Sequence, residues 1–143
     1  MAAEMSAAER EAFLDELPAR TAVLAVTRKD GRPIGAPIWY VRDGDELVFT
    51  TWAESLKGKA LRRDPRIALT IQDPQPPFSY VIAEGEARWS ENTDDLLHWA
   101  TVIRGHYMGA DLGEHYGKRN AVPGELLVRV RPTRWQAARD IAS

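Results

Sequence analysis

The chain has 143 residues, a formal net charge of -2 and no cysteine. This length predicts a single domain over residues 1–143, and the lack of cysteine excludes disulfides, thiolate metal sites and cysteine nucleophiles. The balance of 19 basic and 21 acidic residues argues against general nucleic-acid binding, which needs a broad excess of positive charge. No apolar run approaches the ~20 residues that cross a bilayer, and the acidic N-terminus does not resemble a signal peptide. We therefore expect a cytoplasmic protein that does not bind membranes.

The first part of the sequence predicts a helix followed by three strands in a meander. Ser6 and Glu9 have the spacing of a capping box at the start of the helix, and Pro18 ends it. Asp30-Gly31 and Asp43-Gly44 are signals for tight turns, which join antiparallel neighbours. The predicted strands cover residues 21–27, 37–42 and 46–51.

The second part predicts two more helices and three more strands. Ser55 is a natural N-cap for the first of these helices, and an apolar period near 3.6 residues predicts the second over residues 93–108. Gly85 indicates a bulge or bend in a long strand. Residues 109–124 are polar and rich in glycine, so we expect a loop with a helical turn, and the chain after Pro132 is expected to be a short tail. The predicted strands cover residues 67–72, 79–89 and 126–131.

These elements predict a mainly β fold with peripheral helices, built from about six antiparallel strands that close into a small barrel. A parallel α/β sheet would need helices between most of its strands, and the two Asp-Gly turns exclude that locally.

The segment after the third strand carries the strongest functional signal. Lys57 falls in the first turn after the Ser55 N-cap, where a positive side chain is unfavourable against the helix dipole unless an anion lies nearby. Unpaired backbone N–H groups, the positive end of the dipole and a lysine together favour a phosphate site. An amphipathic helix with a solvated basic face explains the same pattern, and both interpretations stay open. The basic residues of the segment are Lys57, Lys59, Arg62, Arg63 and Arg66.

Other candidate chemistry is sparse. The histidines, His98, His106 and His115, lack the spacing of metal ligands, so no metal site is expected. The sequence has no nucleophile elbow, P-loop or dinucleotide-binding glycine motif. Several aromatic residues fall at strand ends or in loops beside the basic segment. They either pack in a core or dimer interface, or they line a cleft that holds a planar ring. In the second interpretation, the proline-rich loop of residues 74–77 forms one wall of the cleft. The aromatic residues are Trp39, Tyr40, Trp52, Phe78 and Tyr80.

Taken in order, these segments resemble the split-barrel flavin-binding proteins of the pyridoxamine-phosphate-oxidase-like superfamily, and within it the small branch that uses the deazaflavin coenzyme F420. The resemblance covers residues 10–137 and depends on TAVLAVT, DGRPIGAPIWYV, LVFTT, S-x-K with LRRDPR, SYVIAEGEARW and VRVRPTR. It implies a split β-barrel that forms a homodimer, with the cofactor in a groove at the subunit interface. Trp135 or residues 104–120 would then contribute from the partner chain.

The resemblance also implies roles for individual residues. Lys57 would bind the cofactor phosphate with Ser55 and Thr51 nearby, and Pro37, Ile38 and Trp39 would lie along the ring. Tyr80 would lie in the cleft, and Lys59 and Arg62 would meet an anionic tail. Relatives often have asparagine in a K-x-x-N-L pattern, where this chain has Ala60, so one side-chain hydrogen bond of relatives is missing here.

The activity implied is a reductase that moves hydride between F420 and an unsaturated small molecule. No catalytic residue is assigned, and the proton donor is either solvent or a side chain such as Tyr80 or His106. Two alternatives stay open: an FMN-dependent oxidoreductase of the same fold, and a non-catalytic protein that stores or delivers a cofactor or a tetrapyrrole.

Overall fold

The computed structural model describes residues 2–142, and for residues 114, 115 and 120 it describes the backbone alone. The elements are β1 (Ala3–Glu4), α1 (Ala7–Asp15), β2 (Ala22–Thr27), β3 (Pro33–Ile38), β4 (Val41–Asp43), β5 (Glu46–Trp52), α2 (Leu56–Arg63), β6 (Arg66–Asp73), β7 (Ser79–Ser90), α3 (Thr93–Met108), α4 (Ala110–Asn120), β8 (Glu125–Val130) and β9 (Arg134–Arg139).

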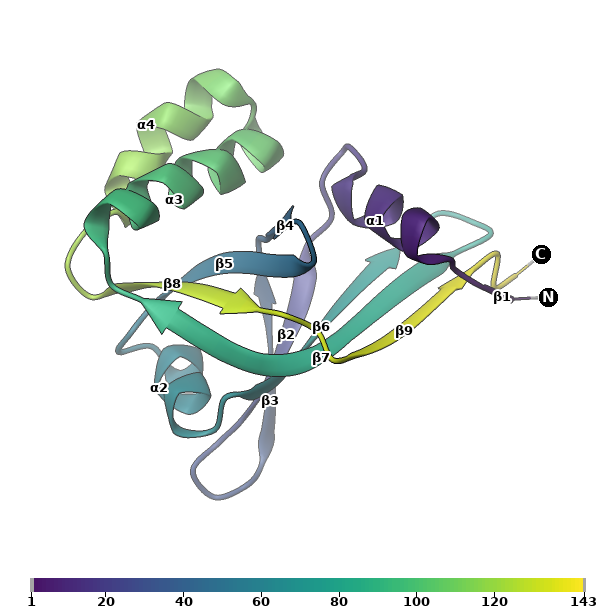
Figure 1. The fold of residues 1–143 in the computed structure, drawn as a ribbon, viewed down its shortest axis with the longest axis horizontal. Helices are drawn as coiled ribbons and strands as arrows, with labels where there is room; N and C mark the ends of the chain where they lie inside the picture. Colours follow the sequence, from purple (N-terminus) through teal and green to yellow (C-terminus); the bar gives the residue numbers. More distant parts are fainter. Residues whose placement is uncertain (1, 143) are drawn as a thin grey trace.

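The strands form one curled antiparallel sheet in the order β3-β2-β6-β7-β8-β5-β4, and β9 joins β7 to β1 along a further edge. The long strand β7 pairs with β6 and β9 along its first part and with β8 along its second, so it belongs to both halves of the sheet. Figure 1 shows the resulting half-barrel, with the α3–α4 pair lying over β5 and β8 and α2 on the other side of these strands. The prediction of a mainly β, antiparallel split barrel with peripheral helices is confirmed.

β7 passes between the two halves of the sheet at Gly85. Its pairing with β6 continues without a gap from Asp73↔Ser79 to Arg66↔Glu86, so Gly85 does not mark a bulge. β7 curves as it passes from one half of the sheet to the other (Figure 1). A Cβ at Gly85 would lie 2.8 Å from the Arg131 carbonyl oxygen. Only glycine lets the two backbones approach this closely.

Within residues 2–142 the structure has nine strands, where the sequence predicts about six. The expected strand of residues 37–42 is divided, because the chain leaves one half of the sheet after Ile38 and enters the other at Val41. The expected tail after Pro132 forms β9, which contains Trp135 and pairs with β7 from Glu84↔Arg134 to Tyr80↔Ala138. Its sequence, RWQAAR, has little apolar pattern, so backbone pairing to a neighbouring strand decides its structure.

The expectation of a loop over residues 109–124 is wrong for its first part, which forms the helix α4. Glycine favours loops over helices, but Gly113 and Gly117 lie four residues apart and therefore share one helix face. A Cβ at Gly113 would lie 2.6 Å from the Gly105 Cα, and one at Gly117 would lie 2.8 Å from the Thr101 Cα. These glycines allow α4 to pack closely against α3.

The apolar residues form two cores. The larger core fills the half-barrel and includes Phe13 and Leu14 from α1 and Leu61 from α2. The capping box predicted for α1 is confirmed, since Ser6 and Glu9 exchange side-chain hydrogen bonds with each other's backbone N–H. The smaller core lies between α3 and the sheet and is made of Val41, Val48, Leu96, Ile103 and Leu127. Within residues 2–142, no helix is both long and apolar enough to cross a membrane.

Candidate functional site

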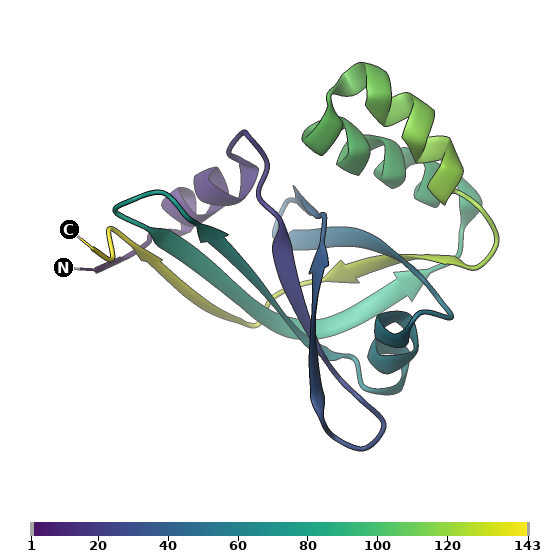
Figure 2. The ribbon, with the colours of Figure 1, turned by 180° about the vertical axis from the view of Figure 1, so that it is seen from behind.

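A cavity of about 390 Å³ lies where β3, β5, α2 and α3 meet. Figure 2 shows the β2–β3 hairpin passing in front of β5, with α2 on one side and the α3–α4 pair above. The lining brings together four of the residues predicted for the site, Pro37, Ile38, Trp39 and Lys57. The other lining residues are Thr21, Thr50, Ala100, Ile103 and Arg104.

The N-terminus of α2 holds Lys57 in place. As predicted, Ser55 is the N-cap: its hydroxyl accepts a hydrogen bond from the Gly58 N–H at 3.1 Å and donates one to the Trp52 carbonyl at 2.7 Å. A Cβ at Gly58 would collide with the Trp52 carbonyl oxygen and lie 2.9 Å from that of Ala53, so this position requires glycine. The turn after β5 is therefore packed tightly under the first turn of the helix.

Lys57 differs in its surroundings from the other basic residues of α2. Among the described residues, no carboxylate lies within ion-pairing distance of its ammonium group. Lys59 lies 3.6 Å from the Glu54 carboxylate, and Arg62 lies 3.8 Å from the same group while donating to the Ala53 carbonyl at 2.6 Å. Local partners thus hold Lys59 and Arg62 at the β5–α2 turn, whereas Lys57 lines the cavity.

Trp39 forms an aromatic wall of the cavity, against α3. Its ring stacks on the Tyr107 ring with a centroid distance of 4.6 Å and an angle of 2°, and the Arg104 guanidinium lies 4.8 Å from its centroid. The Tyr107 hydroxyl donates to the Arg20 carbonyl at 2.7 Å and accepts from the Tyr40 N–H at 3.1 Å. Burial raises the pKa of Tyr107 to about 12, so the phenol stays neutral and keeps both hydrogen bonds.

Sequence reasoning missed Arg104 and Tyr107 as individual site residues. They lie three residues apart on α3, a spacing that places both on one helix face. Nothing in the local pattern indicates that this face meets Trp39, because the contact joins segments more than sixty residues apart.

The remaining predicted residues lie outside this cavity. Thr51 is buried and points to the opposite face of β5 from Thr50, with its hydroxyl 3.3 Å from that of Ser55. Tyr80 and Trp135 line a shallow cavity beside β1 and β9. Residues 74 and 75 of the proline-rich loop line a third cavity of about 650 Å³ with Val23 and Thr70. His106 is placed edge-on to the Tyr107 ring.

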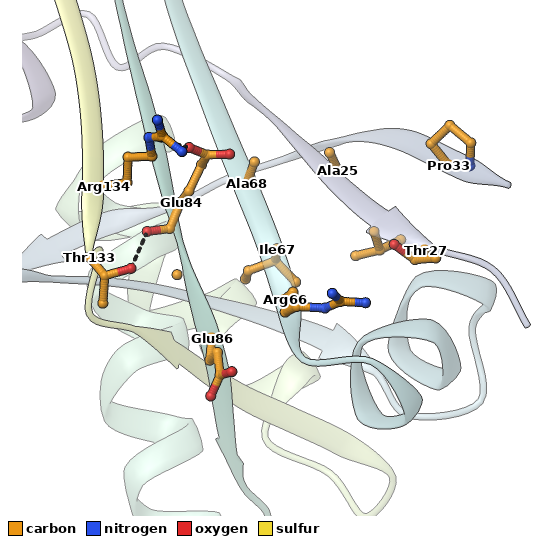
Figure 3. Close-up of a pocket in the computed structure, with 12 residues that line it drawn as sticks. Ala25, Thr27, Pro33, Arg66, Ile67, Ala68, Glu84, Glu86, Thr133 and Arg134 are labelled. Atoms are coloured by element: carbon orange, nitrogen blue, oxygen red, sulfur yellow. Dashed lines mark hydrogen bonds and ion pairs between the residues drawn. The ribbon is translucent and has the colours of Figure 1, made fainter. Parts of the chain in front are cut away.

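Another cavity, of about 460 Å³, lies on the outer face of the sheet between β2, β6 and β7 (Figure 3). Both arginines that line it have local partners: Arg134 lies 3.8 Å from Glu84, and Arg66 lies 2.7 Å from Asp64. Among the described residues, no group of three or more His, Asp or Glu side chains could hold a metal ion; the side chain of His115 lies outside this set.

The Lys57 cavity has the chemistry that a phosphorylated aromatic cofactor needs. An ammonium group without an ion-pair partner and the first turn of α2 supply charge and N–H donors for a phosphate. The flat Trp39 ring and the apolar side chain of Ile38 supply a surface for a ring system. The residues present therefore fit such a group.

The fold defines the class of the protein, a small antiparallel split barrel with peripheral helices. The chain belongs to the pyridoxamine 5'-phosphate oxidase family, whose model matches residues 7–139. No curated protein matches the chain in a sequence search.

Solved structures extend this finding. A conserved hypothetical protein from Mycobacterium tuberculosis is 28% identical with a TM-score of 0.81, covering 93% of this chain and 84% of that one. An F420 reductase is 24% identical with a TM-score of 0.68, covering 87% of this chain and 94% of that one. The heme storage protein HutZ from Vibrio cholerae is 14% identical with a TM-score of 0.69, covering 91% of this chain and 94% of that one. The reductase and HutZ share the fold with this chain.

Proposed function

We propose that this protein is an oxidoreductase that transfers hydride between the deazaflavin F420 and an unsaturated small molecule. The observation that carries the proposal is Lys57, a cation without an ion-pair partner among the described residues, which faces a cavity beside Trp39 at the N-terminus of a helix. A phosphate group supplies an anion in direct contact with this ammonium group and helix N-terminus.

The protein's own residues bind and orient the cofactor. Lys57 and the first-turn N–H groups of α2 hold the phosphate, and Trp39, fixed in its plane by Tyr107, supports the ring. Pro37 and Ile38 complete this wall and exclude water from it. The bound deazaflavin supplies the hydride chemistry. Because neither Tyr80 nor His106 lines this cavity, solvent is the proton source in this proposal.

Two observations favour F420 over FMN as the cofactor. The fold is shared with an F420 reductase, and Arg104 adds a second positive charge to the cavity, which suits a ligand with more than one anionic group. FMN carries a phosphate that Lys57 would bind equally well, so an FMN-dependent oxidoreductase is the second candidate.

The active form in this proposal is a homodimer, with the cofactor at the subunit interface. The outer face of the β3-β2-β6-β7 sheet is the surface that we expect a second copy to cover. Val23, at its centre, is 47% exposed. Cross-strand neighbours on this face form one row of Pro37, Val23, Thr70 and Ile82 and a second row of Gly35, Ala25, Ala68 and Glu84.

A parallel titration of the cofactor-free protein with F420, FMN and heme, followed by fluorescence or absorbance, tests the proposal. F420 is expected to bind more tightly than FMN, and the reduced deazaflavin is expected to be oxidised by members of a panel of conjugated compounds. Tighter binding of FMN would move the protein to the FMN-dependent class. Tight heme binding without oxidation of reduced cofactor would favour the storage function that HutZ represents in this fold.

A further inference from the structure

We propose that Glu125, which lies beyond ion-pairing distance of Lys57, is a longer-range counter-charge to Lys57 and Arg104, and that an incoming phosphate replaces it with the uptake of one proton. This inference rests on the proposed function, because it takes the Lys57 cavity as the cofactor site. It assigns to Glu125 a role in how the affinity of this cavity for anions depends on pH.

The strand register places Glu125 beside the cavity. Glu125 is the first residue of β8 and pairs with Trp52, the last residue of β5 before the turn into α2. Leu127 pairs with the cavity-lining Thr50 and packs in the smaller core under α3. Side chains two residues apart on a strand share a face, so Glu125 lies on the α3 side of β8, diagonal to Thr50.

The charges that act on Glu125 come from two helices. Burial raises the pKa of Glu125, while Arg104 on α3 and Lys57 on α2 both favour its charged form. The residue opposite on β5, Trp52, carries no charge. The carboxylate therefore depends on the same two cations that face the cavity.

A phosphate bound by Lys57 and Arg104 changes this balance. It takes over the cations and adds negative charge nearby, so the pKa of Glu125 rises further and the carboxylate takes a proton from solvent. Binding must then weaken as the pH rises, because at high pH Glu125 keeps its charge and competes for the cations.

The test compares the wild type with Glu125→Gln, and uses Glu91→Gln as a matched control because Glu91 is exposed and lies outside the cavity. FMN and F420 affinities are measured by fluorescence from about pH 5 to about pH 8. Sulfate, whose charge is constant in this window, serves as a competitor that carries no titration of its own.

Relative to Glu125→Gln, the wild type is expected to lose affinity as the pH rises, by up to about tenfold for each pH unit over which binding takes up one proton. At the upper end, Glu125→Gln is expected to bind about five to ten times more tightly than the wild type, and Glu91→Gln is expected to match the wild type. Calorimetry of the wild type in two buffers of different ionisation enthalpy is expected to record proton uptake, a result that needs no variant to fold.

The inference would be overturned if cofactor affinity depended on pH equally in the wild type and in Glu125→Gln, or if calorimetry recorded no proton uptake on binding. If Lys57→Ala still weakens cofactor binding in that case, the cofactor site stands and only the counter-ion role of Glu125 fails. If Lys57→Ala leaves binding unchanged, the proposed site itself is wrong.

Discussion

The replacement of Lys57 by alanine is the sharpest test of the phosphate site. Lys57 lines the cavity and has no ion-pair partner among the described residues, so its loss costs a ligand contact and breaks no ion pair within the protein. A charge-assisted hydrogen bond contributes about 1.5–3 kcal/mol. At 1.4 kcal/mol per factor of ten, the Kd for the cofactor should rise by about 10- to 150-fold.

Lys59→Ala is the matched control, because it removes the same charge from the same helix. The Lys59 side chain is 52% exposed and lies 3.6 Å from Glu54. Exposed pairs of this kind contribute little, so the cofactor Kd should change by less than about fivefold. Fluorescence titration with F420 and with FMN measures both variants, and urea unfolding checks that both fold. Equal weakening by the two variants would refute a specific site at Lys57 and indicate only a general attraction of the basic helix.

Three further predictions address the helix pair, the buried phenol and the proposed dimer. Gly113→Ala should lower the free energy of unfolding by about 1–3 kcal/mol, because its Cβ would collide with Gly105. Gly105→Ala should raise it by about 0.5–1 kcal/mol, since its Cβ meets its nearest neighbour only at 3.8 Å. The free energy of unfolding should fall between pH 10 and about 12, because unfolded Tyr107 ionises before the folded residue does, and Tyr107→Phe should reduce this fall. Val23→Glu should yield a monomer in light scattering and lose cofactor affinity, since it places a charge at the centre of the exposed sheet face.

Each of these predictions has a contradicting result. Similar unfolding energies for the two alanine variants would show that α4 does not need glycine for close packing. If the free energy of unfolding of Tyr107→Phe fell with pH as steeply as that of the wild type, ionisation of this phenol would not be the cause of the fall. A dimeric Val23→Glu protein would place the subunit interface elsewhere.

Local signals predicted much of the fold. The capping box at Ser6, the N-cap at Ser55 and the Asp-Gly turns act over two to four residues, and the structure forms each helix and antiparallel hairpin there. The alternating and continuous apolar runs predicted the strands that fill the larger core. The close backbone approach at Gly85 follows from the same rule, since glycine in a long strand marks such an approach.

The errors arise where tertiary contacts decide the outcome. The glycines of α4 have poor helix propensity, but packing against α3 compensates, and propensity alone cannot show this. β9 has little apolar pattern and is held by its pairing with β7. The candidate site was predicted only in part for the same reason. Lys57 could be found from a local motif, whereas Arg104, Tyr107 and Glu125 reach the site through contacts between distant elements.

A crystal structure of the protein with its bound cofactor would test the central claim most directly. The account predicts that the phosphate lies within hydrogen-bonding distance of the Lys57 ammonium group, with the ring system against Trp39. A phosphate bound elsewhere, for example beside Arg66 and Arg134 on the outer face of the sheet, would contradict it.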